Sequence, residues 1–281
     1  MDPEPTDTAL DDSKLEDATP AAHMRSAAAL VIGNELLTGK IADTNAAVLA
    51  RTLFELGISL RRIVVCPDEV ETIAADLESL CGQHDYVFTS GGVGPTHDDV
   101  TVEAVGRALG RPLVHSAELE ALLTTIYGPL SNPQVQAMAY LPEGVELMAV
   151  PGIPWPTVRV ANVFVLPGMP EVFERQLPAL RAILEGGAPF VSRAVGTRCR
   201  EDELADLLGQ LSARHGAVTI GSYPRAKGQR VRVLVTFDGR DSKQVDRAVG
   251  DLLEALPADR IVELRDTNFE PTVAHRAGTA P

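Results

Sequence analysis

The sequence of 281 residues contains few aromatic residues and no long apolar run. Phe, Trp and Tyr make up only 4% of the residues, so a core must consist mainly of Leu, Val, Ile and Ala. That composition is more typical of parallel sheets covered by helices than of β-sandwiches. Because no stretch approaches the roughly 20 apolar residues that span a membrane, we expect no membrane partner. The length predicts one large and one small domain.

Cysteine is also scarce. Cys66, Cys81 and Cys199 form neither a CxxC pair nor the Cys/His spacing of a zinc site. Their odd number argues against a disulfide framework and favours reduced thiols. The N-terminal segment is acidic, whereas a secretory signal begins with cationic residues followed by an apolar run. We therefore expect a cytoplasmic protein.

Positive charge is limited, because 25 Lys and Arg residues stand against 39 Asp and Glu residues, giving a formal net charge of −14. A chain this acidic, without a basic run, lacks the surface that neutralises nucleic-acid phosphates. We expect a small-molecule ligand and no nucleic acid. Residues 1–26 are acidic and nearly devoid of large apolar side chains. This composition predicts a disordered tail, because little burial offsets the loss of chain entropy.

From Ala27 onwards, predicted strands and helices alternate. This order predicts an α/β fold with a parallel sheet over residues 27–186. Residues 128–160 are rich in proline, and we expect them to be irregular and partly exposed. By hydrophobic spacing, the predicted strands are 27–32, 58–66, 86–89 and 162–166, and the predicted helices are 44–56, 70–80, 100–109, 118–127 and 170–184.

A smaller domain is predicted for residues 190–265, after a Gly- and Pro-containing junction at residues 186–190. Its order is β-α-β-β-α-β, typical of a ferredoxin-like α+β domain. Within it, the turn near Tyr223 carries Arg225 and Lys227. This basic turn is either a hairpin tip, which we favour, or a contact for a ligand phosphate. Residues 266–281 are expected to form a loose tail.

A glycine-rich loop at residues 91–99 follows the third predicted strand. Gly91, Gly92 and Gly94 allow sharp turns and a close approach of the backbone to a ligand. Their N–H groups, together with the start of the next helix, can form a cradle for an anion. Because ligands of parallel sheets bind beyond the carboxyl ends of the strands, the position of this loop indicates a binding site.

The second half of this loop contains Pro95, Thr96, His97, Asp98 and Asp99. Either aspartate could cap the next helix. Two adjacent carboxylates beside a phosphate cradle also fit a divalent metal, which makes Asp98 and Asp99 candidate metal ligands and catalytic residues. His97 is a candidate general base or hydrogen-bond donor, although a lone loop histidine is more often neither.

A second loop follows the first predicted strand and contains a carboxylate and an amide. It is either a turn or part of the same site. The following Asp43 is explained as a helix N-cap, but with Glu35 it could also join an acidic cluster around a metal. A third loop after a strand, at Gly168, either approaches a ligand or turns the chain into a helix. Glu35 is a candidate catalytic residue, and the candidate binding residues from these loops are Gly33, Asn34, Asp43, Thr44, Asn45 and Gly168.

Three of these segments, residues 32–39, 43–45 and 91–99, resemble the molybdopterin-binding (MoaB/Mog-like) superfamily, in the family's order. Within it, the chain looks like the N-terminal domains of CinA proteins and of animal FAD synthases. Residues 162–171 and 221–224 favour the FAD-synthase side. The resemblance covers about residues 27–265 and implies a three-layer fold in a homo-oligomer.

For this branch, the resemblance implies metal-dependent hydrolysis of a nucleotide pyrophosphate such as FAD or ADP-ribose, with Mg²⁺, Mn²⁺ or Co²⁺ as the cofactor. Asp98 and Asp99 would hold the metal, helped by Glu35 or Asp43. One position departs from the family, because Ala137 stands where many relatives carry a basic residue. The alternative is therefore a non-catalytic molybdopterin- or nucleotide-binding protein linked to molybdenum cofactor metabolism.

Overall fold

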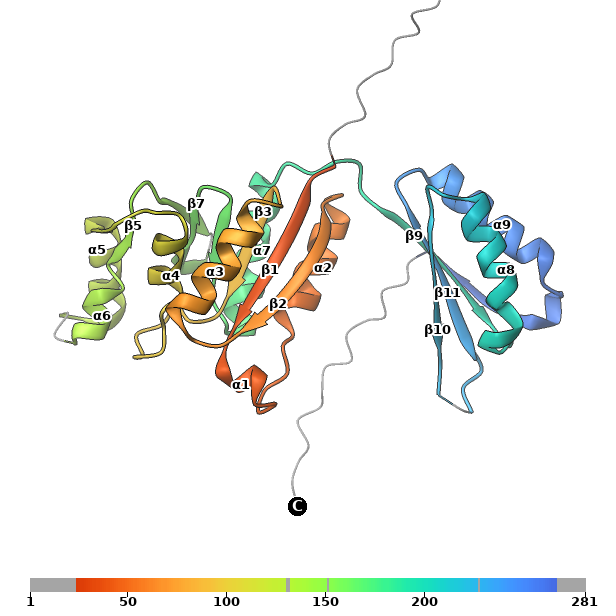
Figure 1. Cartoon of the computed structure of the whole chain (residues 1–281), viewed down its shortest axis with the longest axis horizontal. Coiled ribbons are helices and arrows are strands. Elements are labelled where there is room, and N and C mark those ends of the chain that lie inside the picture. Colours follow the sequence, from red (N-terminus) through yellow and green to blue (C-terminus); the bar gives the residue numbers. More distant parts are fainter. Residues whose placement is uncertain (1–23, 130–131, 151, 227, 267–281) are drawn as a thin grey trace, which may run out of the picture.

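The computed structural model describes residues 24–129, 132–150, 152–226 and 228–266 (Figure 1). Most of the two expected tails, residues 1–23 and 267–281, lies outside the described residues. The first strand begins at Ser26, and Arg25 pairs with Asp85, so the end of the predicted tail at residue 26 is set too late. No helix in the described part of the chain is long and apolar enough to cross a membrane.

The first domain is built on a six-stranded sheet with the order β2-β1-β3-β8-β7-β6. The first four of these strands are mutually parallel, and β7 and β6 extend the sheet as an antiparallel hairpin. The predicted mostly parallel sheet is therefore confirmed. The strands are β1 (Ser26–Ile32), β2 (Ser59–Cys66), β3 (Tyr86–Ser90), β6 (Glu146–Val150), β7 (Ile153–Val160) and β8 (Val163–Leu166).

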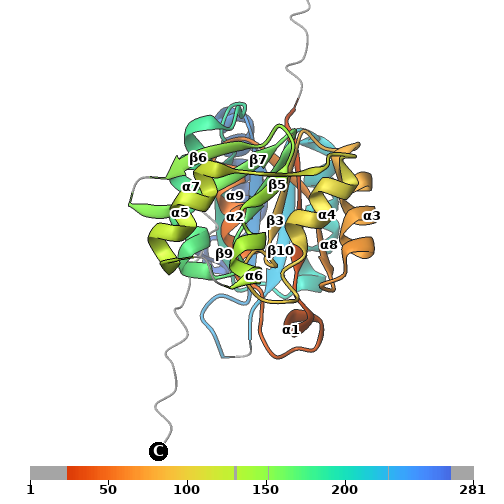
Figure 2. The same ribbon diagram turned by 90° about the vertical axis from the view of Figure 1, so that its left-hand side faces the viewer.

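Helices cover both faces of this sheet, which gives the three layers expected (Figure 2). In β1, Leu30 and Ile32 pack with α3 and α4, whereas Ala27 and Ala29 pack with α2 and α7. Burial on both faces explains why β1 is an unbroken apolar run. The helices are α1 (Asn34–Leu37), α2 (Asn45–Glu55), α3 (Val70–Cys81), α4 (Thr101–Ala108), α5 (Ala117–Tyr127), α6 (Pro133–Ala137) and α7 (Pro170–Ile183).

Residues 128–160 are more regular than predicted, because they contain α6, a strand β5 (Tyr140–Pro142), and the β6–β7 hairpin. β5 pairs with β4 (Leu113–His115), a short strand that was also missed. The prolines are compatible with these elements. Pro133 occupies the first turn of α6, where a missing N–H does no harm. Pro154 and Pro156 lie in the half of β7 that pairs with β6 alone.

The second domain has a four-stranded antiparallel sheet in the order β10-β11-β9-β12, the ferredoxin-like arrangement. The turn after β10 leads into β11, so the basic segment at Arg225 belongs to a hairpin, as we favoured. The elements are β9 (Val191–Thr197), α8 (Glu201–Arg214), β10 (Thr219–Pro224), β11 (Val233–Gly239), α9 (Ser242–Ala255), a 3₁₀ turn (Ala258–Arg260) and β12 (Ile261–Arg265).

The junction between the domains is packed. The rings of Phe54 and Phe190 stack with centroids 4.8 Å apart, and the Arg240 guanidinium lies 4.3 Å from the Phe190 centroid. Arg240 also donates hydrogen bonds of 2.7 Å to the carbonyl oxygens of Ala188 and Gly57. The segment that follows the first domain is therefore attached to α2 and to the second domain.

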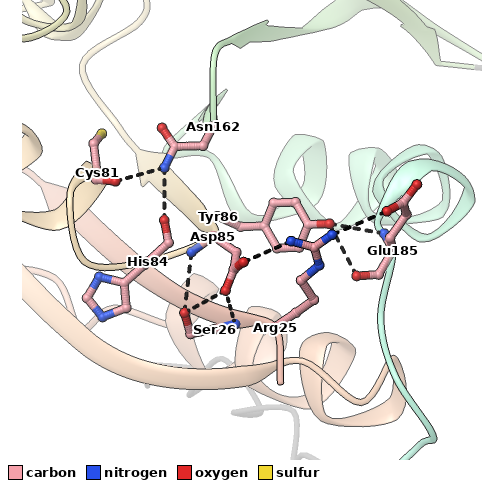
Figure 3. Close-up of polar contacts among 8 residues, drawn as sticks. All are labelled: Arg25, Ser26, Cys81, His84, Asp85, Tyr86, Asn162 and Glu185. Carbon is pink, nitrogen blue, oxygen red and sulfur yellow. Dashed lines mark hydrogen bonds and ion pairs between the residues drawn. The ribbon is translucent and has the colours of Figure 1, made fainter. Parts of the chain in front are cut away.

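Polar groups at the amino end of the large sheet are bonded to one another (Figure 3). The Asp85 carboxylate accepts hydrogen bonds from the N–H and hydroxyl of Ser26, at 2.8 and 2.9 Å, and pairs with Arg25 at 2.9 Å. The Asn162 amide donates to two carbonyl oxygens of the α3–β3 connection. These contacts hold the amino ends of the strands together, so this end of the sheet has a structural role.

Candidate functional site

A cavity of about 610 Å³ opens beyond the carboxyl ends of β1, β3 and β8, where sheets of this type bind ligands. Three loops that are distant in sequence contribute to its wall. The predicted site residues that line it are Glu35, Asp43, Thr44, Asn45, Gly91, Gly92, Gly94, Pro95, Thr96, Asp98, Asp99 and Gly168. The structure does not place Gly33, Asn34 or His97 among the lining residues.

The glycine-rich loop passes very close to the neighbouring backbone. Gly91 has φ +107°, and a Cβ atom there would lie 2.2 Å from the carbonyl oxygen of Ile32. A Cβ atom on Gly168 would lie 3.2 Å from the Cα atom of Gly91. The Thr101 hydroxyl and N–H, at the start of α4, donate to the carbonyl oxygens of Gly91 and Gly92. Glycine is therefore required at Gly91 and Gly168, where the glycine-rich loop meets the loop after β8.

The same loop presents backbone donors to the cavity. Among the described residues, no hydrogen bond is made by the N–H groups of Gly92, Val93 or Gly94, and all three residues line the cavity. Unpaired N–H groups are unusual where the backbone is partly buried. These three N–H groups fit the predicted anion cradle.

Asn45 ties the loops together from the first turn of α2. It is 4% exposed, and its amide donates 2.9 Å hydrogen bonds to the Ser90 hydroxyl and to the Gly168 carbonyl oxygen. The Ser90 hydroxyl also contacts the Pro167 carbonyl oxygen at 3.3 Å. Asn45 therefore sets the spacing of the ends of β3 and β8, and its side-chain NH₂ group is already hydrogen-bonded within the protein.

Asp98 and Asp99 are not helix caps, because α4 has Val100 at its N-cap and no side-chain cap bond. The Thr96 hydroxyl contacts Asp98 Oδ1 at 2.6 Å and also an oxygen of Asp99, which in addition accepts the N–H of Thr96. The hydrogen bond from Thr96, the backbone N–H and the nearby His97 hold the pKa of Asp98 below its ordinary value. Asp98 is thus ionised at neutral pH.

The carboxylates of the second loop have separate roles. The N-cap residue of α2 is Thr44, so Asp43 is not the N-cap itself, but it accepts hydrogen bonds of 3.1 Å from the N–H groups of Asn45 and Ala46 in the first turn and thus has a structural role. The Glu35 carboxylate lies over Gly33, where a Cβ atom would stand 2.5 Å from Glu35 Oε1. The lack of a side chain at Gly33 thus leaves room for Glu35 to reach the cavity wall.

Asp68 was missed by the sequence analysis. It follows the end of β2 by two residues, lines the cavity and accepts a 2.7 Å hydrogen bond from the N–H of Asn34. Burial and the negative charges of Glu35, Asp98 and Asp99 raise its pKa, although the hydrogen bond from Asn34 opposes this shift. The available signal was its position at the carboxyl end of a strand predicted to be parallel.

Charge in the cavity is one-sided. Five carboxylates line it, from Glu35, Asp43, Asp68, Asp98 and Asp99, and no Lys or Arg is among its described lining residues. Cys66 lies at the end of β2, but burial raises the pKa of its thiol to about 12, so it is no nucleophile at neutral pH. The cavity therefore offers carboxylate oxygens and backbone donors.

This donor set fits a divalent cation bound together with a phosphorylated ligand. Within the described residues, no group of three or more His, Cys, Asp or Glu side chains could hold an ion by itself. Glu35 and Asp43 therefore do not join Asp98 and Asp99 in one group of ligands in the structure. Mg²⁺, however, is usually bound by one or two carboxylates and by substrate phosphates. Asp98 and Asp99 fit that pattern, with the backbone donors of the loop nearby.

His97 lies away from the large cavity. Its side chain is 92% exposed, and Nδ1 is 3.9 Å from Asp98 Oδ1. It lines a neighbouring smaller cavity, together with Ala137. His97 is therefore poorly placed to act on a group bound between Asp98 and Glu35.

Comparison with known proteins identifies both domains. Residues 28–183 match the family model described as a probable molybdopterin binding domain, and residues 189–265 match the middle domain of FAD synthase. A protein of Archaeoglobus fulgidus is 34% identical over 225 residues, which cover 80% of this chain and 95% of that protein.

A probable FAD synthase of Caenorhabditis elegans is 31% identical over 263 residues, which cover 83% of this chain but 50% of the relative. The chain thus spans half the length of that relative. The crystal structure of the protein CinA from Thermoplasma acidophilum is 31% identical, with a TM-score of 0.53, over 57% of this chain and 97% of that one. The resemblance seen in the motifs is confirmed, and the chain belongs to the family of probable molybdopterin-binding domains, joined here to a domain of the FAD synthase middle type.

Proposed function

We propose that this protein hydrolyses the phosphoanhydride bond of a nucleotide pyrophosphate, such as FAD or ADP-ribose, in the presence of a divalent metal. The observation that supports this most is the pairing of five carboxylates with unpaired loop N–H groups in one cavity. A diphosphate is repelled by such a cavity unless a cation accompanies it, since like charges at close range are unfavourable. The loop donors then bind the phosphoryl oxygens that the cation leaves free.

Each residue has a distinct part in this proposal. Asp98 and Asp99 hold the cation, and Thr96 orients both carboxylates. When bound, Mg²⁺, Mn²⁺ or Co²⁺ supplies charge stabilisation at the phosphoryl oxygens and lowers the pKa of a coordinated water. The N–H groups of residues 92–94 donate to the diphosphate. Glu35, which lines the same cavity, takes the proton of the attacking water in this proposal.

Membership of the family supports a small-molecule site of the molybdopterin-binding type in residues 28–183. Because the C. elegans relative is about twice as long, its named activity is not transferred to this chain. A homo-oligomeric state stays a prediction, which sedimentation equilibrium would check.

A second candidate function is binding without turnover, of a molybdopterin or a nucleotide. Ala137 favours it, because this exposed residue of α6, on the wall of the smaller cavity, supplies no positive side chain that could stabilise charge in the transition state. The two candidates share the binding step and differ only in product formation. Isothermal calorimetry that shows tight binding of ADP-ribose, with no product after long incubation, would select this second function.

The decisive experiment uses protein stripped of metal and reloaded with Mg²⁺, Mn²⁺ or Co²⁺, then incubated with ADP-ribose or FAD. We expect AMP to be released only in the reloaded samples. Asp98→Asn should reduce kcat/KM by about a hundredfold or more, as expected when a charge-stabilising group is lost. Asp202→Asn is the matched control, since Asp202 is an exposed aspartate of the other domain, with a side chain 64% exposed against 55% for Asp98. Absence of AMP with every metal would contradict hydrolysis.

A further inference from the structure

A second cavity of about 290 Å³ lies beside the first, on the far side of the loop at residues 94–99. The two cavities share six wall residues, Val93, Gly94, Thr96, Asp99, Met138 and Trp155. The smaller cavity is therefore within reach of a ligand whose charged part occupies the larger one.

The two cavities differ in chemistry. Apart from the shared Asp99, Glu103 is the only carboxylate among the described residues of the smaller cavity, which also contains His97, and the rest of its wall consists mostly of apolar or aromatic side chains. The larger cavity carries five carboxylates. A neutral planar ring loses less hydration on burial than a charged group does, and it gains more apolar contact in the smaller cavity than in the larger one. A metal-bound diphosphate requires the carboxylates of the larger cavity.

We propose that the smaller cavity binds the planar heterocycle of the nucleotide, and that Tyr140 and Trp155 are its aromatic contacts. This inference rests on the proposed function for the position of the diphosphate. The shared chemistry is a flat aromatic ring system, which a purine, a flavin or a pterin would supply. Ring stacking on aromatic side chains tolerates all three, because each has a π face.

Tyr140 is held in place before a ligand arrives. It lies in β5 opposite His115 of β4, and the two rings meet edge to face with centroids 5.4 Å apart. His115 Nε2 is in turn 3.2 Å from Glu120 Oε2. Even so, Tyr140 is 46% exposed. An exposed ring that is already oriented loses little conformational freedom when a ligand stacks on it, which favours binding.

Trp155 provides a direct readout, because it is the single tryptophan of the chain. It lies in β7, is partly buried and packs against the core that includes α4 and α5. Because Trp155 borders both cavities, its fluorescence reports occupancy in general. Two exposed tyrosines allow the cavities to be tested separately. Tyr140 lines the smaller cavity and Tyr127 the larger one, and they are exposed by 46% and 49%.

The test measures dissociation constants by calorimetry, in Mg²⁺, for ADP-ribose and for inorganic pyrophosphate. Trp155 fluorescence is recorded in the same titrations. We expect Tyr140→Ala to weaken ADP-ribose binding roughly tenfold while pyrophosphate binding stays unchanged. Tyr223→Ala, a change of a tyrosine 53% exposed in the second domain, should alter neither constant. AMP and FMN as further probes show whether a purine or a flavin is preferred.

The outcomes separate this inference from the proposed function. Tyr140-dependent binding without AMP release would support the ring site and overturn hydrolysis. A larger effect of Tyr127→Ala than of Tyr140→Ala would overturn the ring site, because the ring would then lie in the larger cavity. Equal loss of ADP-ribose and pyrophosphate binding in Tyr140→Ala, or no ADP-ribose binding by the unchanged protein, would overturn it as well.

Discussion

The two ends of the large sheet treat charge in opposite ways. At the amino end, the Asp85 side chain is 13% exposed, and its carboxylate is compensated by Arg25 and by two donors of Ser26. At the carboxyl end, burial and three carboxylate neighbours raise the pKa of Asp68, and its backbone donor, the N–H of Asn34, only partly offsets this shift. The amino end is arranged for stability, whereas the carboxyl end keeps the Asp68 carboxylate beside other carboxylates, with no Lys or Arg among the described residues of the cavity wall.

This difference has a physical consequence. Uncompensated charges in a partly buried site destabilise the free protein, and such perturbed groups concentrate at functional sites. Salt bridges and hydrogen bonds at the other end of the same strands contribute in the opposite direction. The same substitution should therefore change stability with opposite sign at the two ends.

The largest expected effect breaks the backbone of the carboxyl end. Gly91→Ala places a Cβ atom 2.2 Å from the Ile32 carbonyl oxygen, at φ +107°. We expect the free energy of unfolding to fall by about 2–4 kcal/mol, from steric overlap and backbone strain. Urea denaturation at pH 7 measures it.

Gly209→Ala is the matched control. Gly209 lies within α8, and nothing stands within 4 Å of its added Cβ atom. This change should stabilise by up to about 1 kcal/mol, because alanine favours helix. Loss of less than about 0.5 kcal/mol in Gly91→Ala would contradict the close packing of the loop.

A smaller effect is expected at the amino end. Asp85→Asn removes the charge that pairs with Arg25 and replaces one of the two acceptor oxygens, of which one faces Arg25 and the other Ser26, with a donor. We expect a loss of about 1–3 kcal/mol, the usual consequence of leaving partly buried polar groups unmatched. Chemical denaturation at neutral pH checks it.

The control for this change is Asp202→Asn, in which an exposed ion pair with Arg200 is lost. Such pairs contribute little, so stability should change by less than about 0.5 kcal/mol. Similar losses in the two variants would show that the compensation of Asp85 is no more important than a surface contact.

The strands and loops that form the carboxyl end could largely be predicted from the sequence, and the reasons are local. The apolar run of β1 and the glycines after β3 report burial and close approach directly. For Asp68 the sequence offers only its position after a predicted strand, and it is the sheet order β2-β1-β3 that brings the end of β2 beside the other two loops. A role for His97 stays a prediction, since its place in the loop does not decide which side of the loop its side chain faces, and in the structure it lines the smaller cavity.

The hairpin β6–β7 was missed because proline density was taken as a sign of irregular structure. The prolines of β7 lie where the strand has a single neighbour, which is a property of pairing and not of composition. The roles of Asp98, Asp99 and Glu35 stay predictions, because positions in a cavity do not establish chemistry.

The smallest and most discriminating effect is at Asp68. The pKa of Asp68 is raised in the folded protein, so the folded state is favoured while this carboxyl is protonated. The contribution of Asp68 to the free energy of unfolding is therefore fully present below its unfolded pKa and is lost as pH rises through its folded pKa. Asp68→Asn removes this loss and keeps an acceptor for the N–H of Asn34. The variant should therefore be more stable than the unchanged protein at pH 7, by at most about 1 kcal/mol since solvent screens the charges, and the gain should vanish towards acid pH. Denaturation at pH 4 and pH 7 measures the gain and its loss towards acid pH.

Saturating Mg²⁺ should shrink the gain, because a bound cation compensates the carboxylates that neighbour Asp68. Destabilisation at pH 7, as in Asp85→Asn, would mean that the two ends of the sheet do not differ in the way described.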